Sequence, residues 1–405
     1  MSRVCAVSYL SKIEKGSVNC SQEILHQLME VLGIDLNRNP EELSEQREGL
    51  DQFFRNMFLY NLQEMDRLIS QLNESKEMLQ HSSLAVDYML ATGFHQHVGA
   101  LHRESDLEEL GSLVYGLLDY ERYMSPHQTH LTHYLIGHFE MLHKGDYQKA
   151  LSQFQRGARI KRDGIILEGL ASVHYTLGNY AESIRLGDLA FQQLMEEGYL
   201  ERAIGVCFVI AAAYANVRDI DNMLVYYRRL LTLSEKTDNS RRGGVHYNIG
   251  AAYLAVRKFE QAKNNLEKAY HYYKEEEPSY YDKFYLLQKL ALASHGLGEP
   301  VQAEGYTGEL QKLVRDNSER SIGASMETSL EWLIQLCIKK VPLKSPYSID
   351  ILRRLYKQAK KDSHHGFRTF YGDYLIEALK AQHKYKEALQ ITEEIFAQWK
   401  VSSKP

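Results

Sequence analysis

Five histidines grouped in one short stretch are the side chains of this chain best suited to bind a metal ion. They are His127, His130, His133, His138 and His143. His130 and His133 are three residues apart, so they share one face of a helix. A zinc site needs three or four ligands at fixed spacing, but no cysteine or carboxylate stands at a suitable third position and Glu140 fits poorly. We therefore predict no metal site.

Motifs of the common enzyme classes are also missing from the sequence. It contains no Gly-rich phosphate loop, no Ser/His/Asp order and no nucleophile elbow. Its cysteines, Cys5, Cys20, Cys207 and Cys337, form no Cys-x-x-Cys pair, which is typical of reduced thiols in a cytosolic protein. There is no apolar run of about 18 residues that predicts a membrane span. The net charge of −5 argues against general polyanion binding. We predict a cytoplasmic protein that is not an enzyme and uses no cofactor.

Tyrosine and asparagine side chains offer contact surface and hydrogen bonding rather than catalysis. The chain has 28 tyrosines, and a tyrosine combines a flat apolar ring with a polar tip at low cost in conformational entropy. An asparagine amide both donates and accepts, so it can satisfy an N–H and a C=O group of an extended peptide. Asn248, beside Tyr247, stands in a predicted helix, where an amide without a partner would be unusual. A single tyrosine, by contrast, is more often a packing residue than a ligand contact.

These side chains lie in a chain of repeated helical hairpins. Four stretches share a short turn, then an aromatic residue, then a small residue three positions later. They begin at Gly145, Gly178, Arg257 and His383, and looser copies begin at Arg218 and Gly298. Successive turns from Gly145 to Gly298 are about 33 to 41 residues apart, which brackets the 34-residue period of tetratricopeptide repeats (TPR).

The repeated positions have a physical purpose in such hairpins. A small residue at the centre of the first helix lets the second helix approach closely, and the aromatic residue after the turn fills the space between neighbouring hairpins. Because one hairpin cannot bury its apolar face alone, the repeats must stack. We predict an all-α fold, a right-handed TPR superhelix; a generic helical bundle is the alternative.

The pattern divides the chain into four parts. Residues 1–38 form a partial helix-turn-helix segment, and residues 39–128 form a helical linker of degenerate hairpins. The TPR domain covers residues 129–400, and residues 401–405 form a polar tail. Within the TPR domain, residues 330–338 and 349–359 form a further helical pair, separated by the proline-containing stretch 341–346.

The N-terminal segment contains the string Ser-Tyr-Leu-Ser-Lys-Ile-Glu-x-Gly at residues 8–16. It resembles the recognition helix of Xre-type helix-turn-helix proteins, and residues 17–34 resemble the loop and helix that follow it. The resemblance implies that Ser8 and Tyr9 contact bases and that Lys12, Ser17 and Asn19 contact phosphates. It also implies a set of core and capping positions: Leu10, Ile13, Ile24, Leu28 and Leu32 as core, Gly16 as the helix end and Ser21 as an N-cap. Such domains begin with two further helices, so we expect residues 1–38 alone to bind DNA weakly.

An Xre-type segment joined to a TPR array resembles the Rap–NprR–PlcR–PrgX group of peptide-pheromone regulators. In that group the concave TPR surface binds a short signalling peptide, and homodimers are common. Tyr247 and Asn248 resemble a place where the group holds the peptide backbone with an asparagine. Other groove positions are inferred from their place on the first helix of a hairpin: Glu168, Tyr175, Phe208, Asn216, Tyr285, Gln288 and His295.

The resemblance implies a peptide-responsive transcriptional regulator that binds DNA when its helix-turn-helix is complete. Two alternatives remain open. One is a Rap-like protein that binds or dephosphorylates a response regulator, in which Gln52, Gln63 or Gln71 orients a water molecule. The other is a plain TPR adaptor, which would show neither peptide-dependent change nor DNA affinity.

Overall fold

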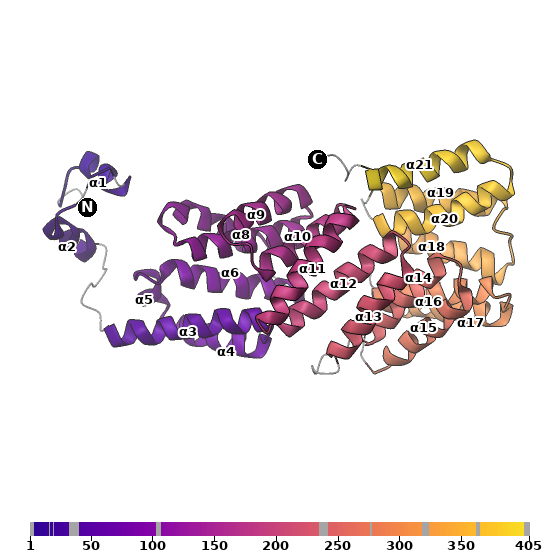
Figure 1. Ribbon diagram of the computed structural model, residues 1–405, viewed down its shortest axis with the longest axis horizontal. Helices are drawn as coiled ribbons and strands as arrows, with labels where there is room; N and C mark the ends of the chain where they lie inside the picture. The colour runs from indigo at the N-terminus through magenta and orange to yellow at the C-terminus, as the bar shows by residue number, and fades with distance from the viewer. Residues whose placement is uncertain are drawn as a thin grey trace. The chain divides into compact units, whose positions relative to one another are not determined.

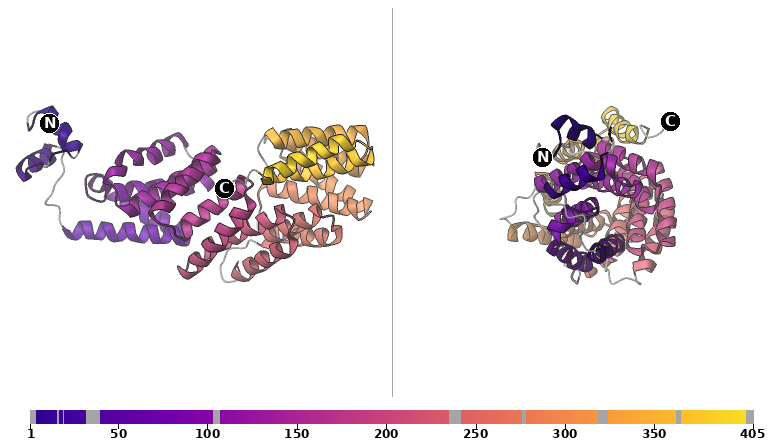
Figure 2. Two further views of the ribbon diagram at one scale, coloured as in Figure 1. Left: turned by 45° about the horizontal axis from the view of Figure 1, so that its top comes forward. Right: turned by 90° about the vertical axis from the view of Figure 1, so that its left-hand side faces the viewer.

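The computed structural model describes residues 4–15, 17–18, 20–31, 40–102, 107–234, 242–275, 278–317, 324–361 and 365–400. Within these ranges the regular structure is helical and contains no strand, as Figure 1 and the two further views in Figure 2 show. The chain forms two compact units, residues 1–166 and residues 167–405. The all-α prediction is confirmed.

The first unit begins with the two short helices of the N-terminal segment and continues with longer hairpins. Its core contains Phe53, Phe54 and Met57 from one apolar stripe of the third helix. The helices are α1 (Val7–Glu14), α2 (Gln22–Val31), α3 (Pro40–Leu59), α4 (Leu62–Glu74), α5 (Lys76–Gln80), α6 (Ala85–His102), α7 (Leu107–Gly116), η1 (Leu117–Tyr123), α8 (Pro126–Phe139), η2 (Glu140–Lys144) and α9 (Tyr147–Ile160).

The second unit contains most of α10 and the helices that follow it. They are α10 (Gly164–Thr176), α11 (Tyr180–Glu196), α12 (Leu200–Asn216), α13 (Ile220–Ser234), α14 (Arg242–Ala255), α15 (Phe259–Tyr272), α16 (Tyr280–Gly296), α17 (Pro300–Asp316), α18 (Ala324–Leu333), η3 (Ile334–Ile338), α19 (Pro346–Lys361), α20 (His365–Ala381) and α21 (Tyr385–Lys400). Helices adjacent in the chain pack as antiparallel pairs, among them α12 with α13, α14 with α15, α16 with α17 and α20 with α21. The predicted helical pair at residues 330–338 and 349–359 corresponds to α18 with η3 and to α19.

All six predicted turns begin with a residue in the left-handed backbone region. Their φ angles are 66° at Gly145, 80° at Gly178, 62° at Arg218, 59° at Arg257, 73° at Gly298 and 58° at His383. This conformation ends a helix and is favourable for glycine, whereas a residue with a Cβ atom carries a cost of roughly 1–2 kcal/mol. Arg218 and Arg257 therefore stand at turn positions where glycine would be more favourable.

Close packing of the hairpins depends on small residues, as predicted. A Cβ atom added at Gly250 of α14 would lie 2.6 Å from Cγ of Leu266 and 3.0 Å from the carbonyl oxygen of Ala262, both on α15. A Cβ atom added at Gly296 of α16 would lie 2.5 Å from the ring of Phe259, the aromatic residue that follows the preceding turn. Gly250 thus allows contact within a hairpin, and Phe259 fills the space between two hairpins.

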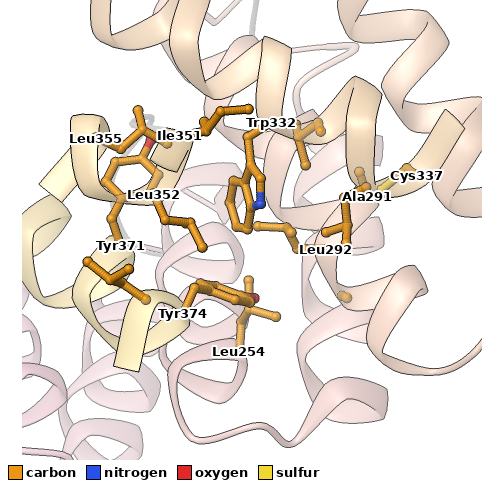
Figure 3. Close-up of a cluster of buried hydrophobic side chains, with 14 of the residues drawn as sticks. Leu254, Ala291, Leu292, Trp332, Cys337, Ile351, Leu352, Leu355, Tyr371 and Tyr374 are labelled. Atoms are coloured by element: carbon orange, nitrogen blue, oxygen red, sulfur yellow. The ribbon is translucent and has the colours of Figure 1, made fainter. Parts of the chain in front are cut away.

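A cluster of aromatic side chains forms the core near the end of the second unit. Trp332 of α18 is fully buried, and its ring centroid lies 5.0 Å from that of Tyr374 and 6.3 Å from that of Tyr371. Figure 3 shows Trp332 among Leu292, Ile351, Leu352 and these two tyrosines. Both tyrosines belong to α20, so this core holds α20 against α18 and α19.

Candidate functional site

A cavity of about 280 Å³ in the second unit brings several of the predicted groove residues together. Tyr175 of α10, Asn216 of α12, and Tyr247 and Asn248 of α14 all line it. The first helices of successive hairpins contribute these side chains, and α20 provides the remaining wall. Alanines fill the lining between the larger residues, which leaves the space open: Ala212, Ala215, Ala251, Ala252 and Ala255. We refer to this cavity as the groove pocket.

The two asparagines of the groove pocket differ in their hydrogen bonding. Nδ2 of Asn216 donates to the carbonyl oxygen of Ala212 at 2.8 Å and approaches Oη of Tyr175 at 3.4 Å. The half-buried amide of Asn248 makes no hydrogen bond with any residue that the structure describes. It therefore presents a free donor and a free acceptor at the pocket, which is the arrangement that a peptide backbone can use.

Lys289 of α16 also lines the groove pocket and is only 6% exposed. Nζ donates to Oη of Tyr247 at 2.7 Å. It lies 4.9 Å from the ring centroid of Tyr247, 5.2 Å from that of Phe370 and 5.5 Å from that of Tyr285. Burial lowers the pKa of Lys289 to about 7, because the aromatic surroundings cannot replace the hydration of the ammonium group.

Sequence reasoning missed Lys289, although a signal was present. It is the one charged residue in the middle of an otherwise apolar and amide-bearing stretch of α16, residues 284–294. A cation at such a position either has a buried anionic partner or serves a function. Among the described residues, no carboxylate forms an ion pair with Lys289.

Two arginines at hairpin turns hold α20 beside the groove pocket. Nη2 of Arg218, in the turn after α12, donates to both carboxylate oxygens of Asp373 at 2.7 and 2.8 Å. Arg257, in the turn after α14, donates to Glu377 at 2.6 Å and lies 4.0 Å above the ring of Tyr374. Burial raises the pKa of Asp373, although the charge of Arg218 opposes this shift.

Five other predicted groove residues lie outside the lining of the groove pocket. Glu168 forms an ion pair with Arg202 at 2.9 Å; burial raises the pKa of Glu168, and the arginine opposes the shift. The ring of Phe208 packs edge-on against Tyr227 at 6.1 Å, and the ring of Tyr285 lies 4.7 Å from that of Phe367.

Gln288 is the fourth and has no exposed surface. Its Nε2 donates to Oη of Tyr371 at 3.1 Å and contacts Oγ of Ser329. Consecutive residues of a helix point about 100° apart, so Gln288 is directed into the core while its neighbour Lys289 reaches the pocket. The fifth residue, His295 at the end of α16, borders a separate cavity with Cys337 and Lys340.

Comparison with known proteins identifies solved structures with a similar fold. The sequence matches no protein-family model and no curated protein. Among solved structures, it is similar to a Rap protein complexed with competence and sporulation factor. The two are 12% identical, with a TM-score of 0.69 and coverage of 89% of this chain and 99% of that one. This chain has the fold of the Rap proteins. The predicted likeness to the Rap–NprR group is confirmed at the level of fold.

Two further structures support this assignment. NprR in complex with its cognate peptide NprX is 13% identical, with a TM-score of 0.59 and coverage of 87% of this chain and 99% of that one. Aspartyl phosphate phosphatase F from Bacillus subtilis is 13% identical, with a TM-score of 0.57 and coverage of 88% and 94%. The similarity to the Rap fold thus extends over almost the whole of each compared chain.

Ahead of the Rap-like hairpins, α1 and α2 occupy the predicted helix-turn-helix segment. Ser8, Lys12 and Ser17 are exposed, Tyr9 is half-buried, and Asn19 lies outside the described residues. Ser21 accepts a hydrogen bond from the backbone N–H of Ile24 at 3.4 Å, in keeping with its predicted capping position. The exposed surface of α1 therefore carries hydroxyl and ammonium groups.

Most of the described side chains at the predicted core positions of this segment are only partly buried. Leu10, Ile13 and Ile24 are half-buried, and Leu28 is buried; Gly16 and Leu32 lie outside the described residues. Among the described residues of α1, none is fully buried. The C-terminal end of α1 contacts η1, because Arg122 and Tyr123 donate to the carbonyl oxygen of Glu14 at 2.7 and 2.6 Å.

Three histidines of the stretch 127–143 contact other side chains of the protein. His130 lies 3.1 Å from Asp163, Nδ1 of His133 lies 2.8 Å from Oε1 of Gln153, and His143 lies 3.0 Å from His97. Burial lowers the pKa of His97 to about 3, so this imidazole is neutral. No group of three or more potential metal ligands occurs in the described parts of the chain.

No helix within the described parts of the chain is long and apolar enough to cross a membrane.

Proposed function

We propose that this protein is a regulator that binds a short signalling peptide in the groove pocket. The unpaired amide of Asn248 is the observation that carries the proposal. An extended peptide has one N–H and one C=O group per residue that need partners, and a free amide supplies both. Tyr175 and Tyr247 line the same cavity and offer ring surface for peptide side chains.

The groove pocket is large enough to hold part of a peptide. Its volume of about 280 Å³ is slightly below the range of about 300–1,000 Å³ that is usual for complete ligand pockets. The pocket therefore receives one or two residues, and the remainder of the peptide lies along the first helices of the neighbouring hairpins. Two proteins of the same fold support the ligand class: the Rap structure contains competence and sporulation factor, and the NprR structure contains the peptide NprX.

Affinity selection tests the proposal without knowledge of the natural peptide. The purified full chain is incubated with a heptapeptide library, retained peptides are identified by mass spectrometry, and their Kd values are measured by calorimetry. We expect Asn248→Ala to weaken binding about tenfold, the effect of losing one hydrogen-bonding side chain. Asn264→Ala, an exposed asparagine on α15, is the matched control and leaves Kd unchanged. Retention of no peptide by the wild-type chain would overturn the proposal.

We propose transcriptional regulation as the output, in a cytoplasmic homodimer. Support comes from the Xre-type string at α1, whose Ser8 and Lys12 are exposed, and from the exposed Ser17 in the loop that follows it. In this mechanism the peptide shifts the population of TPR conformations and thereby the way in which α1 and α2 are presented. Light scattering with and without a selected peptide measures the oligomeric state, and electrophoretic mobility shifts measure DNA affinity.

A second output is suggested by aspartyl phosphate phosphatase F, which has the same fold. Gln52, Gln63 and Gln71 are exposed on α3 and α4, and Oε1 of Gln71 accepts a hydrogen bond from Arg67 at 2.7 Å. An amide of this kind orients a water molecule toward an aspartyl phosphate. Loss of phosphate from the host's phosphorylated response regulators, accelerated by this chain and slowed in Gln→Ala variants, would favour this output over DNA binding.

A further inference from the structure

We infer that Lys289 forms a subsite for a carboxylate group of the bound peptide. The inference deepens the proposed peptide binding and rests on it. It follows from a buried amine at the wall of the groove pocket, an aromatic enclosure around that amine, and the pairing of the other charged groups nearby.

The amine of Lys289 is buried at the pocket without an anion. Its one hydrogen-bond partner among the described residues is Oη of Tyr247, at 2.7 Å. An ammonium group can donate three hydrogen bonds, so two remain for a ligand. A lysine that served only to fill space would be replaced at lower cost by an apolar side chain.

The other charged groups of the groove pocket neutralise each other. Arg218 donates to both oxygens of Asp373, so neither is available to a ligand without breaking that pair. Among the lining residues, Lys289 is therefore the one cation free to receive an anion. One monovalent cation within an aromatic enclosure matches a monoanion, whereas phosphate groups are usually bound by several donors or a bidentate arginine.

The pKa of Lys289 is lowered to about 7 because the amine is buried, and no carboxylate among the described residues pairs with it. An arriving carboxylate stabilises the ammonium form and raises this pKa again. Peptide binding above pH 7 is therefore coupled to uptake of a proton. The titratable groups beside the amine are Tyr247 on α14 and Tyr285 on α16; burial raises the pKa of both tyrosines, so they stay neutral. Asp373 on α20 and Arg218 in the turn after α12 line the same cavity as a pair.

The carboxylate comes either from the C-terminus of the peptide or from an aspartate or glutamate side chain. Three heptapeptide libraries separate these sources. The first has free C-termini and all residue types, the second has amidated C-termini, and the third has free C-termini but no Asp or Glu. Selection is done on the wild-type full chain, on Lys289→Met, and on Lys268→Met, an exposed lysine of α15 that is the matched control.

A terminal carboxylate predicts that the wild-type chain retains peptides from the first and third libraries but not the second. A side-chain carboxylate predicts retention from the first and second libraries, with an acidic residue at one fixed position. In either case, Lys289→Met weakens the Kd of selected peptides about 10- to 100-fold, as expected for a charged hydrogen bond. Lys268→Met leaves it unchanged.

Calorimetry on the wild-type chain gives a second readout that does not depend on a variant. At pH 8, binding measured in buffers of different ionisation heat shows uptake of a proton for a carboxylate-bearing peptide and none for its neutral analogue. Tight binding that is indifferent to peptide carboxylates, without proton uptake, overturns the inference and leaves the proposed function intact. Retention of no peptide from any library overturns both.

Discussion

Arg218 and Asp373 are 155 residues apart in the chain, yet Nη2 of the arginine donates to both carboxylate oxygens of the aspartate. Arg218 begins a hairpin turn with a φ of 62°, in the left-handed region that favours glycine. Arg257 repeats the arrangement at the next turn, with a φ of 59° and an ion pair to Glu377 across 120 residues. Two strained turns thus carry the side chains that hold α20 beside the groove pocket.

Arg218→Ala tests the contribution of this pair to the position of α20. Alanine keeps the left-handed strain but leaves the half-buried Asp373 without its partner. We expect a loss of about 1–2 kcal/mol in the free energy of unfolding, less than for a fully buried pair because the Arg218 side chain is 44% exposed. Urea denaturation measures this loss, and hydrogen exchange should show faster exchange in α20.

Two companion variants make this test specific. Adding Asp373→Asn to Arg218→Ala should recover part of the loss, because the uncompensated charge is removed. Arg228→Ala, an exposed arginine of α13, should change stability by no more than about 0.5 kcal/mol. Unchanged exchange in α20 of Arg218→Ala would show that the aromatic core alone holds this helix.

Gly250→Ala tests the close packing of α14 on α15. The added methyl group would lie 2.6 Å from Cγ of Leu266 and 3.0 Å from a backbone oxygen, so α15 must shift. We expect a loss of about 1–3 kcal/mol in the free energy of unfolding. Gly305→Ala in α17, where a Cβ atom meets nothing within 4 Å, is the matched control and should stabilise the chain by about 0.5–1 kcal/mol. Equal effects at the two sites would contradict the close-packing role of Gly250.

Lys289→Met tests the cost of the buried amine. The pKa of Lys289 is about 7 in the folded chain and about 10.5 when unfolded. Between these values the unfolded state binds more protons, so the contribution of Lys289 to stability rises with pH; below pH 7 both states are protonated and the folded state bears the full cost. We expect Lys289→Met to be more stable than wild type by about 1–4 kcal/mol at pH 6.

The difference between the two proteins should shrink from pH 7 toward pH 10. Thermal unfolding of both proteins across this range measures it, with Lys268→Met as the control that follows the wild-type profile. A pH-independent difference would mean that Lys289 does not titrate in this range.

DNA binding by α1 should be weak. None of its described residues is fully buried, and its exposed basic side chains include Lys12. Because a recognition helix needs a packed support to keep its orientation, we expect no sequence-specific mobility shift below micromolar concentration. A selected DNA library and the purified full chain provide the test; a sub-micromolar, sequence-specific complex would contradict this prediction.

The sequence by itself determined the hairpin architecture. The turns at Gly145, Gly178 and Gly298 were predicted because glycine, the following aromatic and the small residue after it are local signals of helix ends and close packing. Tyr175, Asn216 and Tyr247 were proposed as groove residues from their place on first helices, and Asn248 from the resemblance to the peptide-pheromone regulators. The structure gathers these four around one cavity.

Only the tertiary structure decided which neighbouring positions face that cavity and what closes it. Gln288 and Lys289 are adjacent in the sequence, but the rotation of the helix directs one into the core and the other to the pocket. The pairing of Arg218 with Asp373 depends on the return of α20 after 155 residues. Local periodicity contains no information about such contacts. They arise because the small rotations between successive stacked hairpins add up and bring helices that are distant in the sequence together.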